Sequence, residues 1–514
     1  MFTGLGSIIG SGWLFGAWRA AQLAGPGATY AWLIGAAIIL AIALTYSELG
    51  AMFPESGGMV RYGQYSHGSL VGFVAAWANW IAIVSVIPVE AEASVQYTSS
   101  WPWPWAQALY VGHELTAPGL ALAAALVLVY FLLNYWSVQL FARANSAITL
   151  YKLIVPAATA VALIATTFHR HNFSVGVHGG AHAINFPAVL TAVAISGIVF
   201  SYNGFQSPVN LAGEARNPGT SVPFGILGSI FLATIVYVLL QVAFLGAVDP
   251  AQIAERGWAA INYRSPFAEL ALALNLNWLA LLLYSDAFVS PSGTGLTYTA
   301  TTGRMLYAME KNGSLPALFG RVHPRWGVPR PAMWLNLGVA YLFMFFFRGW
   351  AALAEVISVA TIISYLTGPV SVMTLRRTAP DLHRPFRLPG LAVIAGLAFI
   401  FSTELLYWAR WPRTGEIILL MLVALPLYFY YQARAGFADF RRTLAGAAWL
   451  IAYLPAVALL SWLGSARFGG SGRIPFGWDL ALVAAAGLGF YLWGLRCGWR
   501  TPDVQREIAL RNDR

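Results

Sequence analysis

Hydrophobic positions along this chain fall into long runs that short polar segments separate. A helix of about 20 apolar residues spans the hydrocarbon core of a bilayer. Runs of this length predict helices rather than the strands of a β-barrel, because strands cross a bilayer in roughly ten residues. The pattern predicts an all-α polytopic membrane protein with about 14 transmembrane helices, at residues 2–20, 29–53, 68–98, 117–136, 145–168, 188–212, 223–247, 269–300, 331–347, 353–375, 389–411, 414–432, 445–464 and 478–496.

The few charged residues lie mostly between the apolar runs. They make up 10% of the chain, whereas a soluble domain carries about 25%. With the N-terminus in the cytoplasm, 20 of the 30 Lys and Arg residues, Arg143 among them, fall in cytoplasmic segments and 9 fall outside. The positive-inside rule therefore predicts a multi-pass protein of the cell membrane with both termini cytoplasmic. Because the basic residues are scattered over short loops, we expect no nucleic-acid partner.

Two of the apolar runs contain glycine-rich or polar interruptions. The first run reads Gly-Ser-Ile-Ile-Gly-Ser-Gly at 6–12, and the run at 188–212 reads Phe-Ser-Tyr-Asn-Gly-Phe-Gln-Ser-Pro at 200–208. Small residues there either let helices pack closely or mark places where a helix unwinds. Unwound backbone at membrane depth is tolerated where it lines a cavity or binds a ligand. Interruptions in two corresponding helices, the first and the sixth, indicate a transporter site that suits a small zwitterion such as an α-amino acid.

Lys152 is the most informative charged residue inside an apolar run. An intramembrane charge is costly and indicates a functional site by default. Burial disfavours the charged form of a lysine, so such a group can exchange a proton near neutral pH. The alternative is a lysine whose flexible stem lets its ammonium group reach the cytoplasmic interface.

Several carboxylates also lie inside apolar runs. Glu48, near the cytoplasmic end of the second run, is expected to fix helix packing or a gate. Glu90 and Glu92 are candidate proton relays, and at most one of them faces a pathway unless Pro88 unwinds the helix, because residues two apart point to different sides. Asp286, in a stretch rich in Ser, Thr and Gly, either faces a cavity or hydrogen-bonds between helices.

Other classes of site receive little support from the sequence. It contains no GxxxxGK[ST], GxSxG or HExxH motif, so we expect neither an ATP-driven pump nor an enzyme, and no cofactor. The sole cysteine excludes an internal disulfide. Gly10 lies too close to Met1 for a full spanning helix, so we expect the first helix to be truncated. A loop with histidines is expected to be exposed and polar, although it could bind a metal; they are His169, His171, His178 and His182.

Four segments together resemble the amino acid–polyamine–organocation superfamily of permeases. They are Gly10-Ser11-Gly12; Glu48-Leu49 with Pro54-Glu55-Ser56-Gly57-Gly58 and Tyr62; Gly204-Phe205 with Leu211-Ala212-Gly213-Glu214 and Asn217-Pro218; and Arg304-Met305-Leu306-Tyr307-Ala308-Met309 with Asn312-Gly313 and Leu315-Pro316. Within this superfamily, the chain is most similar to bacterial aspartate:proton symporters. Gln206 departs from the pattern, since many relatives carry an acidic residue there.

The resemblance implies a five-plus-five inverted-repeat fold with broken helices 1 and 6. The first repeat would span 1–168 and the second 188–375, followed by additional helices at 389–496 and a cytoplasmic tail at 497–514. The substrate carboxylate would meet Ser11 and Gly12, its ammonium group would meet backbone near Ile8 and from Phe200 to Tyr202, and Phe200 would act as an aromatic gate. Lys152 falls where some proton-coupled members place a lysine in place of bound sodium. The implied substrate-binding residues are Ile8, Gly10, Ser11, Gly12, Phe200, Ser201, Tyr202 and Gly204.

Together these features predict a secondary active transporter that moves amino acids, with acidic ones such as aspartate as candidate substrates and a proton as the coupling ion. An amino acid exchanger and a sodium-coupled symporter of the same fold remain alternatives. A membrane sensor that binds amino acids without transporting them is an alternative of another class. The substrate side chain and the oligomeric state do not follow from the sequence.

Overall fold

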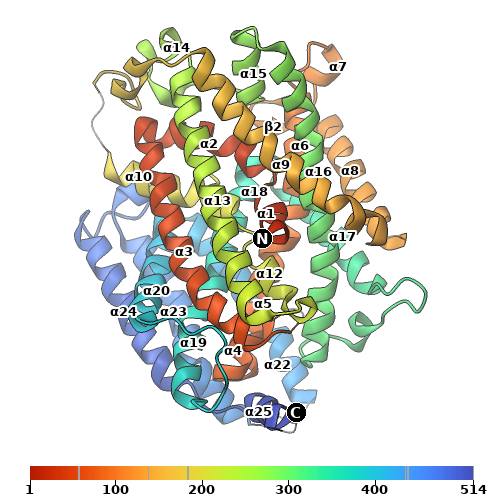
Figure 1. Cartoon of the computed structure of the whole chain (residues 1–514). Coiled ribbons are helices and arrows are strands. Elements are labelled where there is room, and N and C mark those ends of the chain that lie inside the picture. The colour runs from red at the N-terminus through yellow and green to blue at the C-terminus, as the bar shows by residue number, and fades with distance from the viewer. Residues whose placement is uncertain (56–57, 137, 182–184, 435, 437–438, 513–514) are drawn as a thin grey trace.

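The computed structural model describes residues 1–55, 58–136, 138–181, 185–434, 436 and 439–512. It describes their side chains except those of residues 2, 138–146, 214 and 510–512. Ser56, Gly57 and His182 therefore lie outside the described residues, and nothing is described of the Arg143 side chain. Figure 1 shows a bundle of helices that run mostly along one axis, with the C-terminus at one end of the bundle and the N-terminus near its mid-height.

The helices of the first third of the chain follow the predicted apolar runs closely. The run at 117–136 coincides with α8, and the run at 29–53 is shifted by one residue. The only strands among the described residues, β1 (Tyr110–Val111) and β2 (Glu114–Leu115), form a short hairpin. The helices are α1 (Phe2–Ile8), α2 (Gly12–Ala24), α3 (Ala28–Met52), α4 (Met59–His67), α5 (Ser69–Val84), α6 (Val86–Thr98), α7 (Pro104–Gln107), α8 (Ala117–Trp136) and α9 (Val138–Thr166).

The middle of the chain departs from the prediction at one place. The run predicted at 269–300 is instead a helix from Asn277 to Lys311, because Pro266–Ala273 forms a separate helix and Asn275, at φ 59°, turns the chain between them. The helices here are α10 (Phe186–Ile195), α11 (Ile198–Tyr202), α12 (Ser207–Asn210), α13 (Pro218–Ala247), α14 (Pro250–Ala254), α15 (Pro266–Ala273), α16 (Asn277–Lys311), α17 (Arg330–Phe346), α18 (Trp350–Tyr365) and α19 (Thr367–Thr378).

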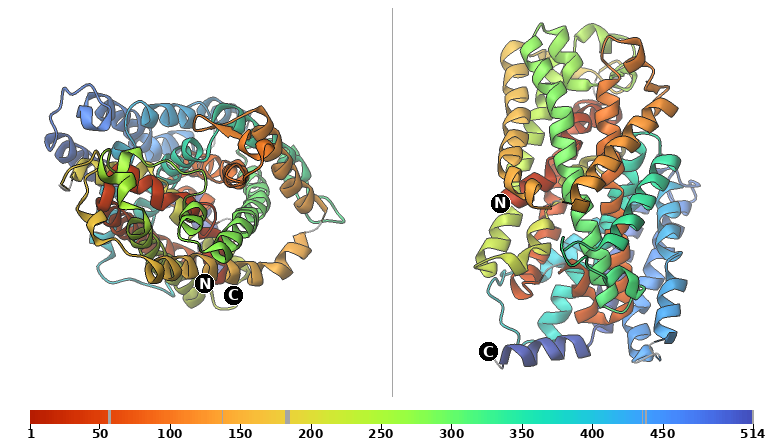
Figure 2. Two further views of the ribbon diagram at one scale, coloured as in Figure 1. Left: turned by 90° about the horizontal axis from the view of Figure 1, so that it is seen from above. Right: turned by 90° about the vertical axis from the view of Figure 1, so that its right-hand side faces the viewer.

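The C-terminal segment adds helices that pack beside α3, α5, α18 and α19. They are α20 (Leu391–Trp408), α21 (Arg413–Leu422), α22 (Leu425–Arg434), α23 (Phe440–Leu463), α24 (Trp478–Cys497) and α25 (Pro502–Asn512). The tail predicted at 497–514 thus contains a helix, which Figure 2 shows lying across the end of the bundle. It docks on α4, where Gln64 Nε2 donates to Asp503 Oδ2 at 2.9 Å and Val504 is fully buried.

Ten helices of the described chain are long and apolar enough to cross a membrane. The predicted runs at 2–20, 188–212, 269–300 and 331–347 do not appear among them as separate spans. The first two are interrupted, the third is the Ser- and Thr-rich α16, and the fourth, α17, has 17 residues. The finding supports a polytopic helical membrane fold without fixing the number of crossings.

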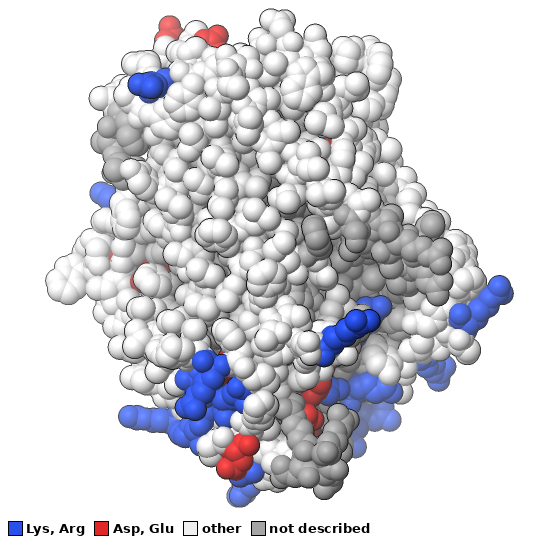
Figure 3. Space-filling view, viewed as in Figure 1, with Lys and Arg blue, Asp and Glu red and all other residues white. Residues whose placement is uncertain are grey.

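The outer surface of the bundle is apolar over a broad band. Figure 3 shows that this band carries few charged side chains on the visible face, with most Lys and Arg side chains gathered at the end that carries α19 and α25. Large apolar side chains point outward within the band, such as Leu281 and Phe231, which are 73% and 69% exposed. Such a surface is stable in lipid rather than in water. The chain is therefore a multi-pass membrane protein.

Two helix pairs form the centre of the bundle. The apolar stretches of α5 with α6 and of α18 with α19 are each 94% buried. Around them, α13 packs on α3, α16 packs on α6, and α18 packs on α5. At the basic end, Arg376 of α19 donates to both carboxylate oxygens of Glu48, with Nε to Oε1 at 2.8 Å. Glu48 therefore fastens α3 to α19, in line with the predicted packing role.

Candidate functional site

Two interrupted helices meet at the centre of the bundle. The helix α1 ends at Ile8 and α2 begins at Gly12, while α11 ends at Tyr202 and α12 begins at Ser207. Both interruptions lie where the glycine-rich and polar sequences predict them. A Cβ atom added at Gly204, whose φ is +127°, would lie 2.6 Å from the carbonyl carbon of Ser7. A Cβ atom at Gly12 would lie 2.3 Å from Ser201 Oγ. Only glycine at these two positions lets the two interruptions touch.

Side chains from neighbouring helices hold the backbone groups that the interruptions release. The hydroxyl of Tyr237, on α13, donates to Ile8 O at 3.1 Å and lies 3.0 Å from Ser201 O. The Ser11 N–H donates to Glu90 Oε2 at 2.8 Å. These contacts satisfy the requirement that polar backbone inside a membrane find a partner within the protein. They also mark the groups that a bound ligand could take over.

Lys152 lies beside the first interruption and does not reach the membrane surface. Its ammonium group donates to Gly6 O at 2.7 Å and to Thr294 Oγ1, on α16, at 2.6 Å. The residue is 1% exposed, so the alternative of a lysine extending to the cytoplasmic interface is wrong. A single cation thereby links α9 to the end of α1 and to the middle of α16.

Glu90 and Thr294 face the interruption from two other helices. A Cβ atom at Gly10 would lie 2.5 Å from Glu90 Oε1 and 2.9 Å from Thr294 Oγ1. Glu90 Oε1 has no hydrogen-bond partner among the described residues. Gly10 therefore lies between the carboxylate of Glu90 and the hydroxyl that contacts Lys152. These side chains form one polar cluster, which we call the break cluster: Glu90, Lys152 and Thr294.

Glu92 and Asp286 lie outside the hydrogen bonds that join the break cluster. The helix α6 runs unbroken from Val86 to Thr98 with Pro88 in its first turn, so Glu92 points about 200° away from Glu90. Both Glu92 oxygens are buried without a partner in the described part of the chain. Asp286 is fully buried and accepts a hydrogen bond from Ser290 at 2.6 Å. It lies about 12 Å along α16 from Thr294, as eight helical residues require.

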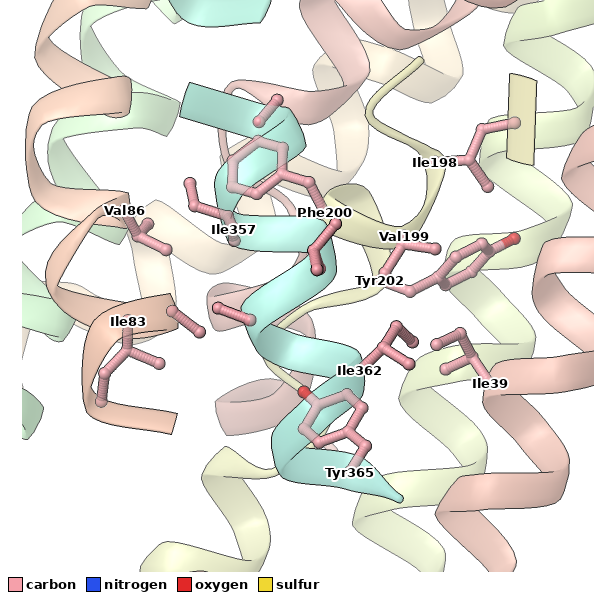
Figure 4. Close-up of a cluster of buried hydrophobic side chains, with 14 of the residues drawn as sticks. Ile39, Ile83, Val86, Ile198, Val199, Phe200, Tyr202, Ile357, Ile362 and Tyr365 are labelled. Atoms are coloured by element: carbon pink, nitrogen blue, oxygen red, sulfur yellow. The ribbon is translucent and has the colours of Figure 1, made fainter. Parts of the chain in front are cut away.

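Aromatic rings cover the interruptions on the side away from the basic end. Phe200 is 5% exposed and packs edge-on against Trp350, with ring centroids 5.8 Å apart. Figure 4 shows Phe200 next to α18, with Ile357 beside it and Tyr365 farther along the same helix. The indole N–H of Trp350 donates to Ser11 Oγ at 2.9 Å.

Polar side chains hold the second interruption, between α11 and α12, through hydrogen bonds. Gln206 Nε2 donates to Asn203 Oδ1 at 2.7 Å, and Gln206 Oε1 accepts the N–H of Gly204 at 2.9 Å. The hydroxyl of Tyr365 also donates to Gln206 Oε1. The amide of Gln206 therefore closes a neutral hydrogen-bond network.

A cavity of about 1000 Å³ extends from the basic end of the molecule as far as Ser7 and Ser207, which flank the two interruptions. Ser7 and Ser207 line its inner part, and Ser207 Oγ donates to Ser7 Oγ at 2.8 Å. Other lining residues include Arg61, Thr297, Arg304 and Glu507. With aromatic rings on one side and this cavity on the other, the structure represents a state that is open toward the basic end.

A sequence model of the amino acid permease family matches residues 1–427. The chain belongs to the amino acid permease family. It is 60% identical over 508 residues to the glutamate/serine transporter AimA of Bacillus subtilis (strain 168). The aligned region covers 98% of this chain and 94% of the relative. The chain is 38% identical over 503 residues to the aspartate-proton symporter of the same organism, covering 97% and 95%. It is 26% identical over 445 residues to large neutral amino acids transporter small subunit 2 of Homo sapiens, covering 85% and 80%.

The permease site contains residues that sequence reasoning did not single out. Tyr237, Thr294, Trp350 and Tyr365 lie in ordinary apolar or hydroxyl-rich runs, where nothing distinguishes them from packing residues. The structure identifies each of them as a site residue, because each contacts an interrupted segment that is distant in sequence. The described part of the histidine loop, residues 169–181, shows no such contact with the site. The described residues contain no cluster of potential metal ligands, and His182 lies outside them.

Proposed function

We propose that this permease is a proton-coupled symporter of small polar and acidic amino acids that works by alternating access. The observation that carries the proposal is the ammonium group of Lys152, buried against Gly6 O and Thr294 at the first interruption. The family supports amino acid transport. The relatives named as a glutamate/serine transporter and an aspartate-proton symporter support the substrate class and the coupling ion.

The substrate lies between the two interruptions in this proposal. Its carboxylate takes the N–H groups of Ser11 and Gly12 at the positive end of α2, and its ammonium group takes carbonyls near Ile8 and from Phe200 to Tyr202. Gly10 and Gly204 leave the necessary backbone free of side chains. Support comes from the present partners of these groups, since Glu90 accepts from Ser11 N–H and Tyr237 donates to Ile8 O. Both partners are side chains that can move when a ligand arrives.

The break cluster couples the substrate to the proton. A substrate carboxylate that takes the Ser11 N–H displaces the Glu90 carboxylate from that hydrogen bond. A buried carboxylate without a donor favours its protonated form, so substrate and proton enter together. Lys152, whose charge acts on Glu90, is the proposed proton-coupling residue, and it also holds the end of α1 in place through Gly6 O. Glu92 and Asp286 are candidate relays farther from the cluster. No cofactor is required in this scheme.

The finer architecture follows the family resemblance. We assign a first repeat to 1–168, a second inverted repeat to 188–375, further helices to 389–496 and a terminal segment to 497–514. The predicted fourteen crossings result when the interrupted helices, α16 and α17 are counted with the ten apolar helices. The basic end, which carries α25, faces the cytoplasm, since Lys and Arg concentrate there (Figure 3).

Uptake into proteoliposomes tests the proposal. Purified protein is reconstituted without sodium and without internal amino acid, and a pH gradient that is acid outside is imposed while radiolabelled glutamate or serine is added. Proton symport gives accumulation that a protonophore abolishes. Uptake that needs internal substrate indicates an exchanger, uptake that needs sodium indicates a sodium symporter, and binding without uptake indicates a sensor; each of these contradicts the proposal.

Lys152→Ala is the decisive variant. Without the ammonium group, Gly6 O loses its donor and pH-driven accumulation is expected to fall at least tenfold, while counterflow exchange of labelled substrate persists. Arg170→Ala, which removes a cation from an exposed loop, serves as the matched control and should behave as wild type. Normal pH dependence of uptake in the Lys152→Ala protein would refute the role of this residue.

A further inference from the structure

Trp350, the first residue of α18, contacts both interrupted helices. Its indole N–H donates to Ser11 Oγ at 2.9 Å, and its ring lies 5.0 Å from that of Phe15 on α2. On the other side it packs edge-on against Phe200 of α11 at 5.8 Å. The residue is 2% exposed. An indole ring on a third helix thus bridges the two segments that are proposed to hold the substrate.

The backbone of the second interrupted helix is shaped to admit this ring. The helix α10 ends at Ile195, and Gly197 takes φ +90° before α11 begins at Ile198. A Cβ atom at Gly197 would lie 2.5 Å from Trp350 Cη2 and 3.3 Å from Cζ2. Glycine adopts this left-handed conformation without strain and leaves the space open. The local bend at Ser196–Gly197 therefore provides the space that the Trp350 ring occupies.

These rings lie on the side of the interruptions that faces away from the cavity. The carbonyl of Arg348, two residues before Trp350, accepts a hydrogen bond from Leu115 N of the β hairpin, and the cavity lies toward the opposite, basic end. Tyr97 of α6 adds a further ring, edge-on to Phe15 at 5.3 Å. We call these residues the outer aromatic layer: Phe15, Tyr97, Phe200 and Trp350. In this layer, Trp350 is the member whose polar atom reaches Ser11.

We propose that Trp350 is a specificity-determining residue, which limits the length of the substrate side chain and orients the Ser11 hydroxyl toward the substrate carboxylate. The inference rests on the proposed function, because it places an amino acid at Ser11. A rigid, close-packed ring leaves no room for a long side chain, and an added methylene group at such a wall changes selectivity by about 10- to 200-fold. The indole N–H directs a lone pair of Ser11 Oγ away from the ligand, so its hydrogen can point toward the carboxylate.

Two substitutions at Trp350 separate these roles. Trp350→Phe keeps a ring but removes the N–H, so the KM for serine and glutamate is expected to rise several-fold with kcat and the range of substrates unchanged. Trp350→Ala opens the wall, so leucine and phenylalanine are expected to become substrates, with their kcat/KM relative to serine rising at least tenfold. Trp478→Ala, which removes a 71% exposed tryptophan at the start of α24, is the matched control.

Gly197→Ala provides an independent test, because its methyl group pushes against the ring from the opposite side. It should raise the KM for serine in the otherwise unchanged protein. In the Trp350→Ala background the same substitution should have a markedly smaller effect, since the atoms it meets are gone. Equal effects of Gly197→Ala in both backgrounds would overturn the assigned contact.

Substrate profiles are measured in proteoliposomes, and binding is followed by thermal shift of the purified proteins with serine, glutamate, leucine and phenylalanine. If Trp350→Ala keeps the wild-type order of substrates, or if Trp350→Phe has the wild-type KM, the proposal fails while the proposed function stands. A wild-type protein that binds none of these amino acids would remove the proposed function itself. If Trp350→Ala does not fold, the KM of Trp350→Phe and the effect of Gly197→Ala in the Trp350→Phe background, which lacks the indole atoms Cη2 and Cζ2, still decide between these outcomes.

Discussion

At the scale of single residues, the site depends on side chains that are absent as much as on those that are present. Gly12 and Gly204 allow two backbone segments to approach within contact distance, and Gly10 leaves space beside Glu90 and Thr294. The glycines at 10 and 12 and at 204 stood out in the sequence because glycine weakens a helix. Their partners did not stand out, because the sequence around a tyrosine or threonine in an apolar helix does not show which distant residue it contacts.

The substitution Gly204→Ala is expected to disrupt the site. The residue has φ +127°, and its new methyl group would lie against backbone atoms of Ser7 and Ile8, which cannot rotate away as a side chain can. Strain of this backbone conformation alone costs about 1–3 kcal/mol. Thermal unfolding in detergent should shift downward, and binding of serine and glutamate should be lost or strongly weakened.

Gly338→Ala is the matched control for that experiment. Gly338 lies in α17, and a Cβ atom there would meet nothing within 4 Å. Alanine in a helix interior is favoured over glycine by about 0.5–1 kcal/mol, so stability should stay unchanged or rise slightly. If Gly204→Ala behaves like Gly338→Ala in both assays, close approach of the two interruptions is not required.

At the scale of elements, the sequence and the structure agree on where helices exist and differ on how each one ends. The apolar runs at 29–53 and 117–136 became α3 and α8 with almost the predicted bounds. The bend at Ser196–Gly197 was not predicted, because one glycine in an apolar run is compatible with a continuous helix. The ring of Trp350, distant in sequence, is what the bend accommodates.

The connection between α3 and α19 is an element-scale prediction. Glu48 is fully buried and Arg376 is 18% exposed, and Arg376 contacts both carboxylate oxygens. Removing one partner of a buried ion pair lowers the free energy of unfolding by about 3–5 kcal/mol. Because Arg376 is partly exposed, we expect Glu48→Gln to lose about 3 kcal/mol or less. Chemical or thermal unfolding of Glu48→Gln, Arg376→Gln and the double variant measures the pair. Additive effects of the two single substitutions would show that the residues do not stabilise each other.

At the scale of the whole molecule, the described state has a cavity toward its basic end and an aromatic layer on the other side of the site. Alternating access requires that these two barriers open in turn. The single cysteine of the chain, Cys497, makes accessibility simple to measure, since Cys497→Ser gives a cysteine-free background.

Thr297→Cys in that background is expected to react with a membrane-impermeant maleimide supplied at the basic end. Thr297 lines the cavity and is partly exposed, whereas Thr403 on α20 is fully buried. Thr403→Cys is therefore the control and should react at least tenfold more slowly. Reaction of Thr297→Cys only from the opposite side of oriented vesicles would contradict both the cavity and the assigned orientation.

Hydrophobic length and composition were enough to predict a helical membrane protein with two interrupted helices and a lysine inside one apolar run. These properties depend on local composition, because the length of an apolar run and the flexibility of glycine affect only the neighbouring residues of the chain. The sequence could not show that Lys152 meets Gly6 and Thr294 rather than the membrane surface, or that Trp350 covers Ser11. Those outcomes depend on which faces of distant helices pack together, and this packing is established only in the folded protein.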